Sequence, residues 1–156
     1  MKNIWFSLYN VVLALWVGGM AIFTFITTPV IFKSFGRDTA GDIVGKLFSG
    51  YFLYILVLSA LALILFFLIS ENRAAPAARL SLVLLVVALA VNTYVTFKLH
   101  PDTVGIKQRI TSFEREAKDT PARKAFSRLH AVSAVFNVLV FIDGIVLIIA
   151  APALRK

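Results

Sequence analysis

Four long apolar runs constrain what this chain can fold into. They cover about residues 8–31, 50–70, 79–98 and 129–151. Each is close to the roughly 20 residues that a helix needs to cross a hydrocarbon core of about 30 Å. A backbone in lipid must satisfy its own hydrogen bonds, and none of the runs alternates polar and apolar residues, so helices are expected rather than a transmembrane barrel. The sequence therefore predicts an all-α, integral membrane four-helix bundle that forms one domain over residues 1–156.

Composition agrees with a membrane location. Hydrophobic residues make up 60% of the chain, against roughly 45–50% in a soluble domain. The absence of cysteine excludes disulfides and a thiolate metal site. The first run is too long for the core of a cleaved signal peptide, so we expect it to stay as the first helix. The net charge of +8 is assigned to membrane loops, not to nucleic-acid binding, because no basic stripe is interleaved with aromatic residues.

The distribution of basic residues predicts the orientation. Four spans put both termini on one side of the membrane. Loops 32–50 and 98–130 hold three and eight Lys or Arg residues, against five on the side of the termini. The positive-inside rule then places both loops in the cytoplasm and both termini outside, in a multi-pass protein of the bacterial inner membrane.

The loop between the third and fourth helices has its own pattern. Apolar residues recur in it at helical spacing: Ile106, Ile110, Phe113 and Ala117. We predict a short amphipathic helix on the cytoplasmic membrane surface, with a solvated charged helix as the alternative. Thr120 is a candidate N-cap and Pro121 a candidate first residue of the last helix. Three basic residues at the start of that helix are expected at the membrane surface, near anionic headgroups: Arg123, Lys124 and Arg128.

Two of the apolar helices carry a polar stripe that runs from a histidine to an asparagine. One stripe comprises His130, Ser133 and Asn137, and the other comprises Asn92, Thr96 and His100. The spacing puts each set on one helix face, and polar side chains avoid lipid, so both stripes should face the interior. We predict a polar cavity open to the cytoplasm that binds a ligand or handles protons. Hydroxyls of the first helix can join it: Thr24, Thr27 and Thr28. The alternative is that these residues only hold the helices together.

Asp143 points away from the stripe of its own helix and lies in the outer half of the membrane. A carboxylate at this depth is costly unless it is paired, hydrated or protonated. Asn10 lies at a similar depth and is the candidate partner. The position indicates a site that responds to protons or cations.

The first helix also has features typical of close packing. Ala14 and Gly18 form a small-xxx-small pair beside Gly19, which lets another backbone approach. Trp16 is expected to fill the adjoining groove. Pro29 is expected to end or kink the helix.

Three motifs in this chain resemble a known family. They are W-x-G-G at residues 16–19, T-x-P-x-x-F at 27–32 and F-x-x-L-H-x-x-S-x-x-x-N at 126–137. The chain resembles the transmembrane protein 205-like family, whose bacterial members are classed as a domain of unknown function. The resemblance covers nearly the whole chain and implies a four-helix membrane protein.

The W-x-G…P-x-x-F segment, which includes the first two of these motifs, is also similar, more distantly, to copper-resistance D proteins and to HemJ, a membrane protein of the haem pathway. This similarity implies a haem b or a transition metal near His100 and His130. Cu(I) prefers soft ligands, however, and Met20 is the single methionine besides Met1.

Three functions are compatible with the sequence. The first is a transport, export or resistance component, which would need a homo-oligomer because four helices make a thin wall. The second is a redox protein with haem held between His100 and His130. The third is a non-catalytic module that binds lipid or a partner. No nucleophile elbow, P-loop or HExxH motif is present in the sequence, so an enzyme is not expected.

Overall fold

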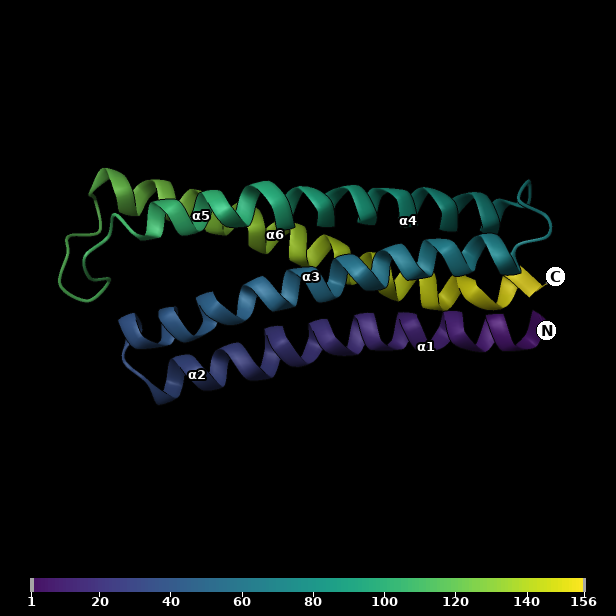
Figure 1. The fold of residues 1–156 in the computed structure, drawn as a ribbon, viewed down its shortest axis with the longest axis horizontal. Helices are drawn as coiled ribbons and strands as arrows, with labels where there is room; N and C mark the ends of the chain where they lie inside the picture. The colour runs from purple at the N-terminus through teal and green to yellow at the C-terminus, as the bar shows by residue number, and fades with distance from the viewer. Residues whose placement is uncertain (1, 156) are drawn as a thin grey trace.

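The computed structural model describes residues 2–155 and consists of four long helical stretches (Figure 1). The first joins α1 (Lys2–Ala21), a π-helical segment (Ile22–Thr27) and α2 (Thr28–Ser34). The second is α3 (Arg37–Ile69). The third joins α4 (Pro76–Tyr94), a π-helical segment (Val95–Leu99) and α5 (His100–Lys107). The fourth is α6 (Pro121–Ala150), which ends in a 3₁₀ turn (Ala151–Arg155). The predicted all-α four-helix architecture is confirmed.

All four stretches are long enough and apolar enough to cross a membrane. They contain 33, 33, 32 and 34 residues, or about 50 Å each at a helical rise of 1.5 Å per residue. A hydrocarbon core is about 30 Å thick, so each helix extends beyond it. The outer surface of the bundle is apolar as well: Ile149 is 73% exposed and Phe97 is 67% exposed. Lipid tails can cover such side chains without cost, so the chain is a multi-pass membrane protein.

The helices form a ring in which α1 packs on α3, α3 on α4, α4 on α6, and α6 on α1. Both termini lie at one end of the bundle, beside the turn between α3 and α4 (Figure 1). Lys2 forms an ion pair there with Glu71. The short turn after α2 and the long connection before α6 lie at the other end, which we call the loop end.

Pro29 and Pro101 both lie inside helical stretches, and neither of them ends its helix. Pro29 was predicted to end or kink the first helix, yet helical structure continues to Ser34. A π-helical segment precedes each proline: the Thr28 N–H donates to the Phe23 carbonyl, and the His100 N–H to the Val95 carbonyl. This wider turn accommodates a ring that would clash with the carbonyl four residues earlier, and Pro101 is tolerated in the same way.

The amphipathic helix predicted after the third span is shorter than expected. α5 ends at Lys107, and residues 108–120 form turns instead of continuing the helix to Ala117. The reason is a set of competing hydrogen bonds. The Ser112 hydroxyl and the Phe113 N–H both donate to the Asp38 carboxylate, each at 2.5 Å. Side chains that bind backbone groups in this way favour turns over helix.

The start of the last helix agrees with the prediction. α6 begins at Pro121 with Thr120 as its N-cap residue. The Thr120 hydroxyl does not cap the helix, however, because it donates to Glu116 Oε1 at 2.8 Å. Arg123 donates to the Glu116 carbonyl, and its guanidinium lies 5.4 Å from the centre of the Phe113 ring. Arg123 is therefore bound to the loop instead of standing free at the surface.

Candidate functional site

A small cavity lies inside the bundle, where side chains from all four helical stretches meet. Its lining includes Tyr51 of α3, Asn92 of α4, and Ser133 and Asn137 of α6. The asparagine ends of the two polar stripes predicted from the sequence thus face the same space, whereas Thr96 and both histidines do not line it. The cavity measures about 10 Å³, which is about the room that one water molecule needs.

A chain of hydrogen bonds crosses three helices beside this cavity. The Tyr51 hydroxyl donates to Asn137 Oδ1 at 2.5 Å, and Asn137 Nδ2 donates to Thr24 Oγ1 at 3.0 Å. The Tyr51 ring stacks on Phe23, with ring centres 4.2 Å apart. Asn137 is therefore satisfied on both sides of its amide. Hydrogen bonds of this kind stabilise membrane bundles by about 0.6 kcal/mol each.

Asn92 lines the cavity and is left with an open donor. It is 8% exposed, and within residues 2–155 no protein atom accepts a hydrogen bond from its Nδ2. Buried polar groups normally have a partner. The Asn92 amide therefore gives the cavity a donor that a water molecule or a small polar ligand can use.

The histidine ends of the two stripes have separate neighbours. His100 Nε2 lies 3.0 Å from the Ser49 hydroxyl, and its ring packs against Phe48 and Phe52 of α3. His130 is exposed, and its ring lies parallel to that of Phe126, one turn earlier in α6. Across residues 2–155, no three His, Asp or Glu side chains are grouped so as to hold a metal ion. A metal bound by this predicted pair would thus have at most two such ligands.

Thr96 completes the stripe of the third helical stretch. Its hydroxyl donates to the Phe52 carbonyl at 3.4 Å, so it joins this stretch to α3. Thr96 belongs to the π-helical segment that precedes Pro101. The stripe therefore changes role along its length, from the cavity at Asn92 to contacts with α3 at Thr96 and His100.

Asp143 lies in the interior without a hydrogen-bond partner. Both of its carboxylate oxygens are buried, and in the described part of the chain no donor reaches them. The predicted pairing with Asn10 is wrong, because neither Asp143 oxygen accepts a hydrogen bond from the described residues, and Asn10 Nδ2 donates to the Phe6 carbonyl of its own helix at 2.8 Å. Tyr9 takes that place: it is fully buried, and its hydroxyl lies close enough to Asp143 to interact electrostatically. The Tyr9 hydroxyl also has no hydrogen-bond partner among residues 2–155.

Tyr9 and Tyr51 are two interior polar residues that the sequence patterns missed. Both were counted as part of apolar runs because most of the side chain is a ring. A buried tyrosine hydroxyl normally finds a hydrogen-bond partner. A tyrosine within an apolar run is therefore a signal for a polar contact, and this signal is present at both positions.

Close helix packing occurs next to the predicted small-residue pair, not at it. Ala14 is exposed, and a Cβ added at Gly18 would meet nothing within 4 Å. At Gly19 an added Cβ would lie 2.6 Å from Tyr54, and at Gly144 it would lie 2.7 Å from Val17. Trp16 is fully buried, with its Nε1 3.2 Å from the Met20 sulfur.

Comparison with known proteins identifies the family. Residues 11–112 match the family described as "Domain of unknown function (DUF4149)". The match begins within α1 and runs through α5 to the start of the connection before α6. No curated protein and no solved structure matches the chain. The chain, a multi-pass membrane protein, therefore belongs to the DUF4149 family.

Proposed function

We propose that this protein is a transport or export component of the bacterial inner membrane, in which Asp143 binds and releases protons or small cations. The observation that carries the proposal is the isolation of this carboxylate. It is buried, and within residues 2–155 it forms no hydrogen bond. A charged group at the centre of a membrane helix costs roughly 2.5–3.5 kcal/mol. A carboxylate that binds no neighbouring side chain does not hold helices together, so a functional role accounts for it better.

Polar groups lie at two depths along the bundle axis, which the proposed path would connect. Asn137 at the cavity and Asp143 are six residues apart on α6, or about 9 Å along the helix. Tyr9 of α1 interacts electrostatically with Asp143. Asn92 of α4 lines the cavity together with Asn137. The interior thus offers two polar levels on the same helix. The cavity at the first level is small, which suits protons or small cations better than large solutes.

Two further expectations belong to this proposal. The excess of basic residues at the loop end favours an orientation with that end in the cytoplasm and both termini outside. A bundle of four helices leaves a thin wall around an axial path, so we expect a homo-oligomer. The resemblance to the transmembrane protein 205-like family is compatible with both expectations.

A flux assay tests the proposal. The purified protein would be reconstituted into vesicles that contain a pH-sensitive dye, and a membrane potential would be imposed with potassium and valinomycin. We expect faster proton entry than in protein-free vesicles, and we expect Asp143→Asn to remove the difference.

The matched control is Asp102→Asn. Asp102 forms an exposed ion pair with Lys98 at 3.1 Å, and we expect its substitution to leave the flux unchanged. Circular dichroism would confirm that both variants keep their helices. Equal flux in the wild-type protein and Asp143→Asn would refute the role of Asp143. Wild-type flux no faster than in protein-free vesicles, with sodium or potassium gradients tested as well, would refute the transport function.

A further inference from the structure

The two halves of the bundle are joined differently at the loop end than elsewhere. Helix packing at this end joins α2 to α3 and α5 to α6, and Figure 1 shows these pairs as separate arms. Hydrogen bonds of individual side chains link the α2–α3 pair to the α5–α6 pair. Five residues carry the outermost of these links, beyond the contact between Ser49 and His100. We call them the clasp: Asp38, Asp42, Lys107, Ser112 and Phe113.

Lys107 makes the first link of the clasp. From the end of α5 its ammonium donates to the Gly41 carbonyl at 2.7 Å and to Asp42 Oδ1 at 2.8 Å. The side chain lies against Gly45, where an added Cβ would come within 3.3 Å of Nζ. Small residues on this face of α3 therefore leave room for the lysine to cross.

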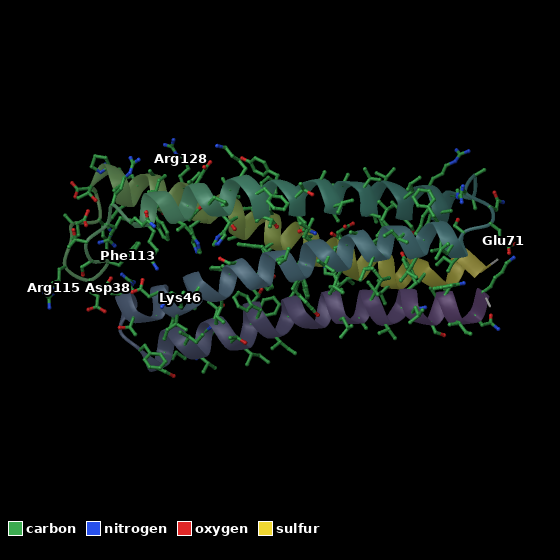
Figure 2. All side chains as sticks on the ribbon, in the orientation of Figure 1. Asp38, Lys46, Glu71, Phe113, Arg115 and Arg128 are labelled. Carbon is green, nitrogen blue, oxygen red and sulfur yellow. The ribbon has the colours of Figure 1, made fainter. Side chains whose placement is uncertain are left out.

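Asp38 makes the second link. It holds the loop through the Ser112 hydroxyl and the Phe113 N–H. The Phe113 ring in turn packs edge-on against Phe126 of α6, with ring centres 5.0 Å apart. This link runs from α3 through the loop to α6. Figure 2 shows Asp38, Phe113 and Arg115 together at this end, opposite Glu71.

The clasp lies above the cavity along the bundle axis. His100, which contacts Ser49, is seven residues before Lys107, or about 10 Å deeper. Asn92 is eight residues before His100, about 12 Å deeper again. Between the clasp and the cavity, the rings of Phe48 and Phe52 stack 5.2 Å apart and pack against His100. Opening the clasp would separate α5 from α3 where this aromatic layer lies.

The arms also have points at which they can bend. α5 follows the π-helical segment Val95–Leu99, and α2 follows the segment Ile22–Thr27. Sharp changes in helix direction occur at π-helical turns and prolines, and this chain has both at each position. We propose that the clasp controls access from the loop end to the polar cavity, with these segments as pivots. This inference rests on the proposed transport function and names the regulation of the same path.

The absence of cysteine from the natural sequence permits a direct test. Ser133→Cys would place one thiol at the cavity, and its reaction with a membrane-impermeant thiol reagent added at the loop end would be followed by mass spectrometry. We expect Asp38→Ala or Lys107→Met, added to this background, to raise the labelling rate at least about tenfold, as loss of a charge-assisted hydrogen bond implies. The control, Asp102→Ala, breaks an ion pair within the same arm and should leave the rate unchanged.

A charge exchange separates opening of the clasp from general damage to the fold. Asp42→Lys and Lys107→Asp should each raise the labelling rate. The double variant should be labelled more slowly than either, although loss of the Lys107 donation to the Gly41 carbonyl keeps its rate above the starting value. Equal rates in the clasp variants and the control would overturn the inference, and so would a double variant that is labelled as fast as the single variants. Labelling does not depend on transport. Clasp-dependent labelling without proton or cation flux would therefore refute the transport function alone, whereas flux with unchanged labelling would refute the clasp alone.

Discussion

At the scale of single residues, the interior distinguishes polar groups that have a partner from polar groups that have none. Asn137 is bound on both sides, by Tyr51 and by Thr24. Asn92 and Asp143 each keep buried atoms that, in the described chain, no hydrogen bond reaches. The first arrangement stabilises the bundle, and the second leaves groups that can interact with something that enters it. This contrast is the reason for assigning function to Asp143 and a supporting role to Asn137.

Glycine positions give a prediction at the same scale. We expect Gly144→Ala to lower the free energy of unfolding by about 1–3 kcal/mol, because the new methyl group would lie 2.7 Å from a Val17 methyl. Gly18→Ala is the matched control, since its methyl group would meet nothing within 4 Å. It should be neutral or stabilising by up to about 1 kcal/mol, from helix propensity alone. Unfolding in mixed detergent would measure both, and equal effects would show that α1 and α6 do not approach at Gly144.

The shared cavity of Asn92, Ser133 and Asn137 was predictable, but the partners of these residues were not. Spacing along one helix fixes which side chains share a face. It does not fix how neighbouring helices are rotated against each other. Asp143 shows the difference: the sequence placed Asn10 at the right depth, yet the adjacent Tyr9 faces the core instead. Neighbouring residues differ by about 100° around a helix, so an error of one residue changes the partner.

At the scale of elements, local and distant interactions compete for the connection before α6. The spacing of Ile106, Ile110 and Phe113 suits a helix, and α5 does extend to Lys107. Beyond it, contacts with Asp38 determine the backbone. That residue lies 74 and 75 positions away from its two partners, so no local pattern could reveal the contact. The start of α6 was predictable because Thr120 and Pro121 are local signals.

Hydrogen exchange gives the prediction for this element. We expect Asp38→Ala to raise amide exchange in residues 111–116 by about tenfold, because the Phe113 N–H and the Ser112 hydroxyl lose their charged acceptor. Exchange of the same peptide in Asp119→Ala serves as the control, since Asp119 is exposed. If exchange is the same in both variants, Asp38 does not hold the loop.

At the scale of the whole molecule, the fold was the most predictable property. Lipid offers no hydrogen bonds, so a single membrane span must form its backbone hydrogen bonds internally, as a helix does. The apolar runs therefore largely determine the architecture. Three of the helical stretches contain their predicted spans and extend past them at both ends, and α3 begins before its span and ends one residue short of it, at Ile69. Orientation depends on a different property, the distribution of Lys and Arg, which the arrangement of the helices does not test.

Single cysteines test that orientation in intact cells. Ala74→Cys lies in the exposed turn at the end of the termini, and Lys118→Cys lies in the exposed part of the connection before α6. We expect an impermeant thiol reagent outside the cell to label the first variant and not the second, because the basic loops stay in the cytoplasm. Labelling of Lys118→Cys alone would reverse the orientation.

The central claim is that Asp143 is a carboxyl group in the membrane interior that takes up and releases a proton or small cation. Its most direct test uses dicyclohexylcarbodiimide, which partitions into lipid and reacts with protonated carboxylic acids. Intact-protein mass spectrometry of vesicle-embedded protein would count the adducts. We predict one adduct in the wild-type protein that is lost in Asp143→Asn and kept in Asp102→Asn. No adduct in the wild-type protein, or one that persists in Asp143→Asn, would contradict the claim.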